Sequence, residues 1–284
     1  MSAKQHTVQC LSPAGLHRMS YLEWGACDNP RVLVCVHGLT RNAHDFDALA
    51  EALAVHYRVI CPDIVGRGLS GRLRDPAHYA IPQYVADMVT LIARLNVDSV
   101  HWLGSSMGGL IGMALAAQEG SPIRRLILND VGPVIEEAAL VRISEYVGLD
   151  PDWASFDEAL ACVRSISAPF GPLTDAQWRA LTEHSVMQRP DGRWAFRYDP
   201  RIAEPFRTAY AGGDINLWPV YDAIACPTLA IRGGESDLLS RDVWQAMAGR
   251  GPSARLAEIP GVGHAPMFQD DTQIAIVRDF LLAA

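Results

Sequence analysis

The chain has 284 residues, of which 49% are hydrophobic and 20% charged, so it has enough apolar side chains for a packed core. Its formal net charge is −8 and no run of Lys or Arg stands out, which argues against a nucleic-acid partner, because phosphate backbones are bound by clustered cations. No uncharged apolar stretch approaches the roughly 20 residues of a membrane span, and the first residues have no apolar core of signal-peptide length. The cysteines form no Cys-x-x-Cys pair, so we expect structural thiols in a cytoplasmic protein.

Short apolar runs alternate with helix-like segments through most of the chain. An edge hairpin is expected around Met19–Trp24. The predicted strands that follow are Arg31–Val36, Tyr57–Cys61, Ser99–Leu103, Arg125–Leu128, Thr228–Ile231 and Arg255–Ile259. The predicted helices between and after them are Phe46–Val55, Ile81–Leu95, Met107–Gln118 and Thr272–Leu282. Continuous hydrophobicity is typical of strands covered on both faces, so the order predicts an α/β fold with a mostly parallel sheet between helices.

Residues 132–216 interrupt this alternation and are expected to form several helices joined by loops. Between Tyr146 and Trp218 lie 11 of the chain's 22 aromatic residues. These side chains can form the core of a small helical layer, line an apolar pocket over the strand ends, or do both. We therefore predict a core domain of residues 1–131 and 217–284, with a helical cap of residues 132–216 inserted into it.

The clearest chemical motif is Gly-x-Ser-x-Gly, centred on Ser106. An apolar strand precedes it and a helix-forming run follows it, which is the context in which this motif forms a strained strand-to-helix turn. The turn closes only if the neighbours two positions away, Gly104 and Gly108, are small. Ser105 cannot serve in this frame, because Leu103 stands two positions before it. Ser106 is therefore the predicted nucleophile.

A serine hydroxyl needs a base to take its proton. Among nine histidines, His264 lies in a glycine-containing loop directly after the last predicted strand and before the last helix. Such a loop can bring the imidazole back over the sheet, so His264 is the predicted base.

A carboxylate should orient the imidazole and stabilise its charged form. Asp237 follows the penultimate strand and is the predicted acid. Asp130, which ends the strand before the predicted cap, and Glu235 remain alternatives. Asp237 could instead be a solvated loop carboxylate that caps the helix expected to begin near Ser240.

The oxyanion of a tetrahedral intermediate needs backbone N–H donors. We expect them from Met107, which follows the nucleophile, and from Leu39, in the loop after the first parallel strand. His37, in the same loop, is interpreted as an organiser of that loop. The histidines show no metal-binding spacing, and no glycine-rich nucleotide loop is present, so no metal and no cofactor are predicted.

These motifs together resemble the α/β-hydrolase fold, in its cap-bearing serine hydrolase form. The resemblance rests on His37-Gly38, the segment Asp63–Ser70, the Ser106 turn, and the order Ser106, Asp237, His264. It implies an eight-stranded, mostly parallel sheet, a helical cap inserted after the strand ending near Asp130, and a serine mechanism without a cofactor. Haloalkane dehalogenases and epoxide hydrolases have an aspartate where Ser106 stands, so the chain departs from them.

The predicted function is hydrolysis of a small, mostly apolar carboxylic ester through an acyl-enzyme. The predicted partner is a small-molecule ester or related carbonyl substrate, with no nucleic acid and no membrane. The resemblance also admits C–C bond hydrolases, lactonases and perhydrolases. A C–C hydrolase substrate carries a carboxylate, for which the candidate cations are Arg41, Arg164, Arg189 and Arg193. A ligand-binding protein with little turnover is the alternative from a different class.

Overall fold

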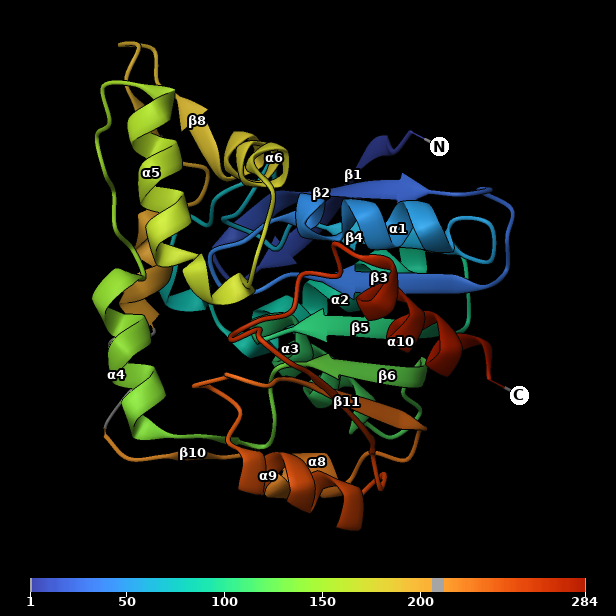
Figure 1. The fold of residues 1–284 in the computed structure, drawn as a ribbon. Helices are drawn as coiled ribbons and strands as arrows, with labels where there is room; N and C mark the ends of the chain where they lie inside the picture. The colour runs from blue at the N-terminus through green and yellow to red at the C-terminus, as the bar shows by residue number, and fades with distance from the viewer. Residues whose placement is uncertain (1, 206–211, 284) are drawn as a thin grey trace.

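The computed structural model describes residues 2–205 and 212–283. A central sheet has the strand order β1-β2-β4-β3-β5-β6-β11-β12 (Figure 1). Its strands are β1 (Lys4–Ser12), β2 (Gly15–Trp24), β3 (Val32–Val36), β4 (Arg58–Pro62), β5 (Val100–Ser105), β6 (Ile123–Asn129), β11 (Thr228–Gly233) and β12 (Arg255–Ile259). The six strands from β4 to β12 are parallel to one another, and β1 and β2 are antiparallel. The predicted eight-stranded, mostly parallel sheet is confirmed.

The edge hairpin is formed by β2 and the strand before it, β1, which was not predicted. Residues Met19–Trp24 belong to β2, which pairs in register with the preceding strand β1 and, on its other side, with β4. The strand β1 was not predicted, because its residues 4–12 are mostly polar and only alternate positions are even partly buried, so they form no apolar run. One face of an edge strand meets solvent, so a continuous apolar run is not required there.

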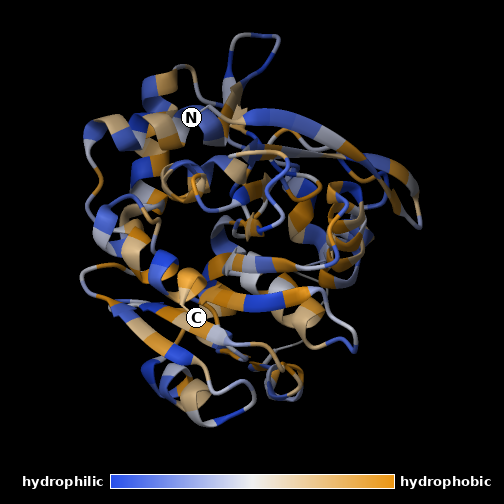
Figure 2. Ribbon diagram, turned by 90° about the vertical axis from the view of Figure 1, so that its right-hand side faces the viewer, coloured by the Kyte–Doolittle hydropathy of each residue, from blue (hydrophilic) through white to orange (hydrophobic). Residues whose placement is uncertain are grey.

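Helices cover both faces of the sheet. They are α1 (Asp47–Leu53), α2 (Ile81–Leu95), α3 (Met107–Ala116), α8 (Trp218–Asp222), α9 (Arg241–Ala246) and α10 (Asp271–Leu282). Buried residues of α1 and α10 pack together on one face, and those of α2, α3, α8 and α9 pack on the other. In Figure 2 hydrophobic colouring follows the central strands, which lie between these two layers. None of the helices within the described residues is long and apolar enough to cross a membrane.

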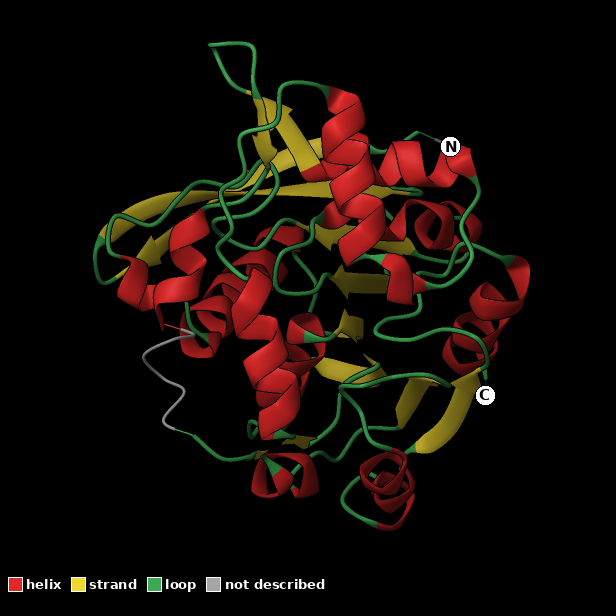
Figure 3. Cartoon of the chain, turned by 60° about the vertical axis from the view of Figure 1, so that its left-hand side comes forward, coloured by secondary structure: helices red, strands yellow, loops and turns green. Residues whose placement is uncertain are grey.

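Residues 132–216, which we call the insertion, separate β6 from β11 in the chain. Its elements are β7 (Val134–Ile135), α4 (Glu137–Tyr146), α5 (Phe156–Ile166), α6 (Asp175–Ser185), β8 (Val186–Gln188), β9 (Trp194–Phe196) and β10 (Ile215–Asn216), with 3₁₀ turns at Ala168–Phe170 and Pro200–Ile202. Figures 1 and 3 show α4, α5 and α6 beyond the carboxyl ends of the parallel strands. Two aromatic residues of the predicted cap, at positions 206 and 210, lie outside the described residues.

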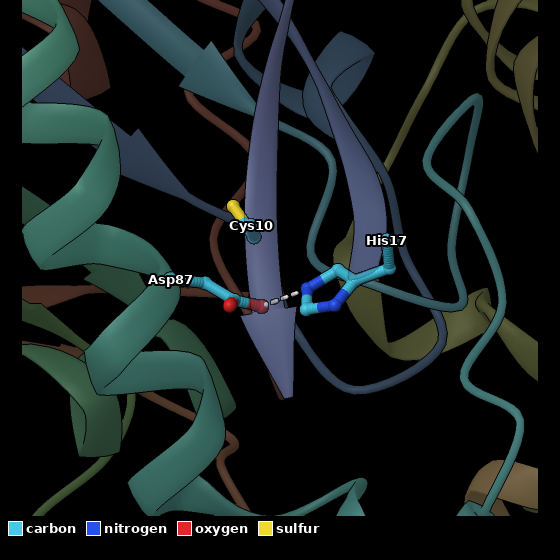
Figure 4. A group of neighbouring side chains, drawn as sticks. All are labelled: Cys10, His17 and Asp87. Atoms are coloured by element: carbon cyan, nitrogen blue, oxygen red, sulfur yellow. Dashed lines mark hydrogen bonds and ion pairs between the residues drawn. The ribbon is translucent and has the colours of Figure 1, made fainter. Parts of the chain in front are cut away.

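A buried polar cluster joins the edge hairpin to α2 (Figure 4). Cys10 on β1 pairs in register with His17 on β2, and His17 Nε2 lies 2.9 Å from Asp87 Oδ2 on α2. Gln83 donates to the other oxygen of Asp87, at 2.8 Å. Burial, with the nearby Asp87 carboxylate, raises the pKa of the Cys10 thiol to about 12. The carboxylate of Asp87 is satisfied by these contacts, whereas the buried Nδ1 of His17 has no hydrogen-bond partner among the described residues. We interpret the cluster as a structural link between the hairpin and the helix.

Candidate active site

Ser106 lies on the turn between β5 and α3, and its backbone is strained. Its φ is 51° and its ψ is −115°, a conformation that few residues with a Cβ adopt. The flanking glycines are sterically required. A Cβ on Gly104 would lie 2.1 Å from the carbonyl oxygen of Gly108, and a Cβ on Gly108 would lie 2.0 Å from that of Val36. The sequence motif therefore has the local conformation that its spacing predicts.

His264 links the Ser106 hydroxyl to a buried carboxylate. Its Nε2 lies 3.0 Å from Ser106 Oγ, and its Nδ1 lies 2.7 Å from Asp130 Oδ2. Asp130 is fully buried at the end of β6. Its carboxylate also accepts the N–H of Gly233 at 2.8 Å and the hydroxyl of Ser236 at 2.6 Å, which fix its orientation. The arrangement can pass a proton from Ser106 to His264 while Asp130 balances the resulting charge.

The expected contact between Asp237 and His264 is not formed. Asp237 is half exposed, and its carboxylate pairs with Arg142 of α4 at 2.8 Å. Since β6 and β11 are neighbours in the sheet, Asp130 and the loop after Gly233 reach the same edge. The loop is folded so that Ser236, and not Asp237, contacts Asp130, which is the carboxylate beside His264. Asp130, the alternative from the sequence, occupies the position expected for Asp237; neither Asp237 nor Glu235 contacts His264 among the described hydrogen bonds.

The loop after β3 is held by His37. The Nε2 of His37 accepts the N–H of Ile64 at 2.9 Å, so its Nδ1 carries the proton that it donates to the carbonyl oxygen of Gly38 at 2.7 Å. Burial lowers the pKa of His37 to about 3, which keeps the ring neutral. A peptide unit is planar and trans, so anchoring the Gly38 carbonyl directs the N–H of Leu39 to the opposite side. His37 is therefore an organiser of this loop, as the sequence suggested.

Arg67 is a second anchor of this loop, and sequence reasoning missed its role. Its Nε donates to the carbonyl oxygen of Leu39 at 2.8 Å, and its Nη2 lies 3.7 Å from Sδ of Met107. The only sequence signal was the position of Arg67 between two glycines in the segment Asp63–Ser70. Asp63 shapes that segment by accepting the N–H of Leu69 at 2.8 Å.

A cavity of about 380 Å³ opens above Ser106 and His264. Leu39 and Met107 line it as well, so the predicted oxyanion donors and nucleophile face one space. Its walls are mostly apolar and come from the core and from the insertion. The insertion contributes Ile135, Leu140, Ile143, Tyr146, Val163, Ile166, Phe170, Phe196 and Tyr198, among others. Other aromatic residues of the insertion, Trp153, Phe156 and Trp194, pack around its own small core, so the aromatic residues serve both purposes considered from the sequence.

Two arginines line this cavity. Arg41 is paired with Asp45 and also donates to Ser185 Oγ at 3.0 Å. Arg142, which was not a candidate, pairs with Asp237 as described above. The other candidate cations form ion pairs on the insertion's surface: Arg164 with Asp175, Arg189 with Asp150 and Asp152, and Arg193 with Asp152.

Two groups of potential metal ligands occur within the described ranges, and neither includes the Ser106 site. One is the buried cluster of Figure 4. The other consists of His44, Asp47 and His184, where the imidazoles of His44 and His184 stack with their centroids 3.6 Å apart. His44 Nδ1 also lies 2.8 Å from Asp47 Oδ2. Because His184 belongs to α6, we interpret the stacked pair as a contact between the core and α6.

Comparison with known proteins places the chain in a family. A family model described as the alpha/beta hydrolase fold matches residues 31–271. A 3-hydroxybutyrate-oligomer hydrolase from Cupriavidus necator is 52% identical, over 98% of this chain and 97% of its own length. Esterase YbfF from Escherichia coli is 28% identical over 83% of this chain and 87% of its own. The solved structure of an alpha/beta hydrolase from Novosphingobium aromaticivorans is 36% identical, covers 99% of both chains and superposes with a TM-score of 0.87. The chain therefore belongs to the alpha/beta hydrolase family, and its function is that of a hydrolase.

Proposed function

We propose that the protein is a serine esterase in which Ser106, His264 and Asp130 form the catalytic triad. The observation that carries the proposal is the continuous chain of contacts from Ser106 Oγ through the imidazole of His264 to Asp130 Oδ2, at 3.0 and 2.7 Å. Ser106, where this series of contacts begins, lines a cavity that is large enough for a small molecule, since small-molecule sites measure roughly 300–1,000 Å³.

The mechanism follows from these positions. Ser106 Oγ attacks the acyl carbon of the ester while His264 Nε2 takes the hydroxyl proton. The amides of Leu39 and Met107 donate to the oxyanion of the tetrahedral intermediate. When the intermediate collapses, the C–O bond to the alcohol breaks and His264 gives its proton to the leaving oxygen. Water, deprotonated by His264, then attacks the acyl-enzyme and releases the acid.

We propose oligomers of 3-hydroxybutyrate as the substrate class. The support is the 52% identity, over almost the full chain, with a relative named for that substrate. These oligoesters carry methyl groups along the chain and a carboxylate at one end. The apolar cavity walls suit the methyl groups, and Arg142, which is partly exposed where it lines the cavity, suits the carboxylate. The carboxylate would then replace Asp237 as the partner of Arg142.

Residues 132–216 are proposed to act as a cap over the site. Their side chains form one wall of the cavity, and the core elements form the other. When an ester is bound between two apolar walls, water is excluded from the reacting carbonyl. The interaction of the oxyanion with its donors is then stronger.

The test is hydrolysis of the 3-hydroxybutyrate trimer, followed by titration of the acid released. We expect turnover by the intact protein and at least a 10³-fold loss in Ser106→Ala, because the nucleophile is gone. Equal release by both proteins would contradict the serine mechanism, and stoichiometric retention of the trimer without release would indicate a binding protein.

A second arm tests the role of Arg142. Arg142→Ala should raise KM for the trimer acid by roughly 10-fold and leave KM for its methyl ester unchanged, because only the acid has the carboxylate. Arg164→Ala, which removes an arginine that pairs with Asp175 away from the cavity, is the matched control. Equal effects of Arg142→Ala on acid and methyl ester would contradict carboxylate recognition.

A further inference from the structure

Arg67 is a buried cation without an anionic partner. Its side chain is 1% exposed, and among the residues that the structure describes it forms no ion pair with a carboxylate. Buried charges in proteins are as a rule paired, because moving a charge out of water is costly. Among the described residues the other buried arginine is Arg232, which follows the rule, since it pairs with Glu258 at 3.1 Å. The absence of an anionic partner for Arg67 among the described residues therefore indicates a functional role for its charge.

Every hydrogen-bond partner of the Arg67 guanidinium is neutral. Its Nη1 donates to the carbonyl oxygen of Val65 at 2.8 Å and to the hydroxyl of Tyr84 at 2.9 Å. The guanidinium carbon also lies over the rings of Tyr79 and Tyr84, 5.7 and 5.2 Å from their centroids. Burial raises the pKa of both phenols, so neither ionises to cancel the charge. The guanidinium is held in place while its full positive charge remains.

The same guanidinium contacts both residues of the proposed oxyanion site. It donates to the Leu39 carbonyl oxygen at 2.8 Å and contacts Sδ of Met107 at 3.7 Å. These two residues, on separate loops, line the cavity beside Ser106. Arg67 does not itself line the cavity, but it contacts both residues whose amides are proposed to bind the negative oxygen.

We propose that Arg67 is a positioning residue for the oxyanion, which it also stabilises by its unpaired positive charge. The inference rests on the proposed serine esterase function. The ester carbonyl is neutral in the bound substrate and its oxygen carries a full negative charge in the tetrahedral intermediate. A fixed charge in a water-poor interior therefore favours the transition state over the bound substrate, which raises kcat more than it lowers KM.

The experiment compares Arg67→Met, Arg67→Gln and Arg67→Lys on p-nitrophenyl butyrate, a neutral ester. Met removes the charge and the donors, Gln keeps an uncharged NH₂ donor group, and Lys keeps the charge without the planar fork. For each variant we would measure kcat, KM and the inhibition constant of butaneboronic acid. That inhibitor bonds to Ser106 Oγ as a tetrahedral anion, and the hydroxyl proton passes to His264, so it reports stabilisation of negative charge.

We expect Arg67→Met and Arg67→Gln to lower kcat and to weaken boronate inhibition by the same factor, about 10- to 100-fold. Their KM should change less than threefold. The expected loss of kcat is below the 10²–10³-fold effect of a direct oxyanion donor. For Arg67→Lys, kcat and the inhibition constant should stay within about fivefold of the wild-type values. A role limited to holding Leu39 and Met107 in place would lower kcat and boronate affinity without a consistent advantage of Arg67→Lys, which keeps the charge, over Arg67→Gln, which does not.

Arg125→Met is the matched control, since Arg125 also anchors carbonyl oxygens, of Phe280 and Ala283, but belongs to the opposite end of β6. A kcat of Arg67→Gln equal to that of the wild type would overturn the role of the charge. A kcat of Arg67→Lys as low as that of Arg67→Gln would do the same. If Arg67→Met does not fold, the Gln and Lys pair decides. Failure of the proposed function is distinguishable, because boronate would then not inhibit the wild-type protein.

Discussion

Asp130 and Asp237 follow neighbouring strands that end at the same edge of the sheet, and the structure brings only Asp130 to His264. The difference arises in two turns. Asp130 adopts a positive φ of 53° at the end of β6, and its carboxylate turns toward the Gly233 N–H and the Ser236 hydroxyl. The same contacts bind the loop after β11 in the conformation that leaves Asp237 beside Arg142.

Substitution of the two carboxylates separates their roles. Asp130→Ala should lower kcat for p-nitrophenyl butyrate by roughly 10³- to 10⁴-fold, because His264 loses the group that orients it and stabilises its charged form. Asp237→Ala, the matched control, should stay within about threefold of the wild type. The measurement is steady-state turnover of this neutral ester, and the reverse order of effects would contradict the assignment of Asp130.

Residue roles tied to a local motif could be predicted from the sequence. Ser106 and His264 meet as expected, since a strand-to-helix turn and a late loop define their positions along the chain. The acid could not be chosen, because the choice depends on how the loop between β11 and α9 folds against the end of β6. Arg67 could not be recognised, because nothing in the sequence showed that its partners would be neutral.

At the scale of elements, the approach of α3 to β3 and β5 determines the position of the nucleophile. The helix starts directly after Ser106, and its first turn lies against the backbone at the end of β3. Gly108 has no side chain at this contact, and the carbonyl oxygen of Val36 occupies the space that a Cβ would need. Close packing here is a condition for the strained turn.

Gly108→Ala should therefore lower the free energy of unfolding by at least about 2 kcal/mol, because two backbones must move apart to admit the methyl group. Gly249→Ala is the matched control, since no atom lies within 4 Å of a Cβ built there, and we expect a change within about 0.5 kcal/mol. Urea denaturation followed by circular dichroism measures both. An unchanged free energy of unfolding in Gly108→Ala would show that the contact between Gly108 and Val36 is not tight.

The central elements were predictable because each has a strong periodic signal. Helix α2, Ile81–Leu95, was predicted with its observed ends, which carry Pro82 in the first turn and Asn96 in the left-handed conformation at the end. The edge strand β1 was missed, since half of its side chains meet solvent and the apolar run used to find strands is absent.

At the scale of the whole molecule, the insertion is fastened to the core on both sides of the cavity. On one side, Asn42 donates to the carbonyl oxygen of His184 at 3.1 Å, next to the contact between Arg41 and Ser185. On the other, the N–H of Gly68 donates to the carbonyl oxygen of Arg197 at 3.0 Å. These contacts hold the cavity wall contributed by the insertion against the core, and a wall held in this way would let the proposed cap select substrates by size.

Filling the cavity from the insertion should change the preferred chain length. Ile166, at the end of α5, lines the cavity and is 45% exposed, so Ile166→Trp adds volume without disturbing a packed core. We expect kcat/KM for the 3-hydroxybutyrate trimer to fall by roughly 10-fold and that for the dimer to change less. Val141→Trp, at a similarly exposed position of α4 that does not line the cavity, is the control. Equal losses for dimer and trimer would contradict selection by length.

The most direct test of the serine mechanism is covalent labelling by an alkyl fluorophosphonate, which an activated serine attacks with loss of fluoride. We expect one adduct per chain, found by mass spectrometry on the peptide that contains Ser106, with loss of esterase activity in proportion to labelling. Labelling should be slower by several orders of magnitude in His264→Ala, because the base is absent. An active protein that is not labelled, or is labelled at another residue, would contradict Ser106 as the nucleophile.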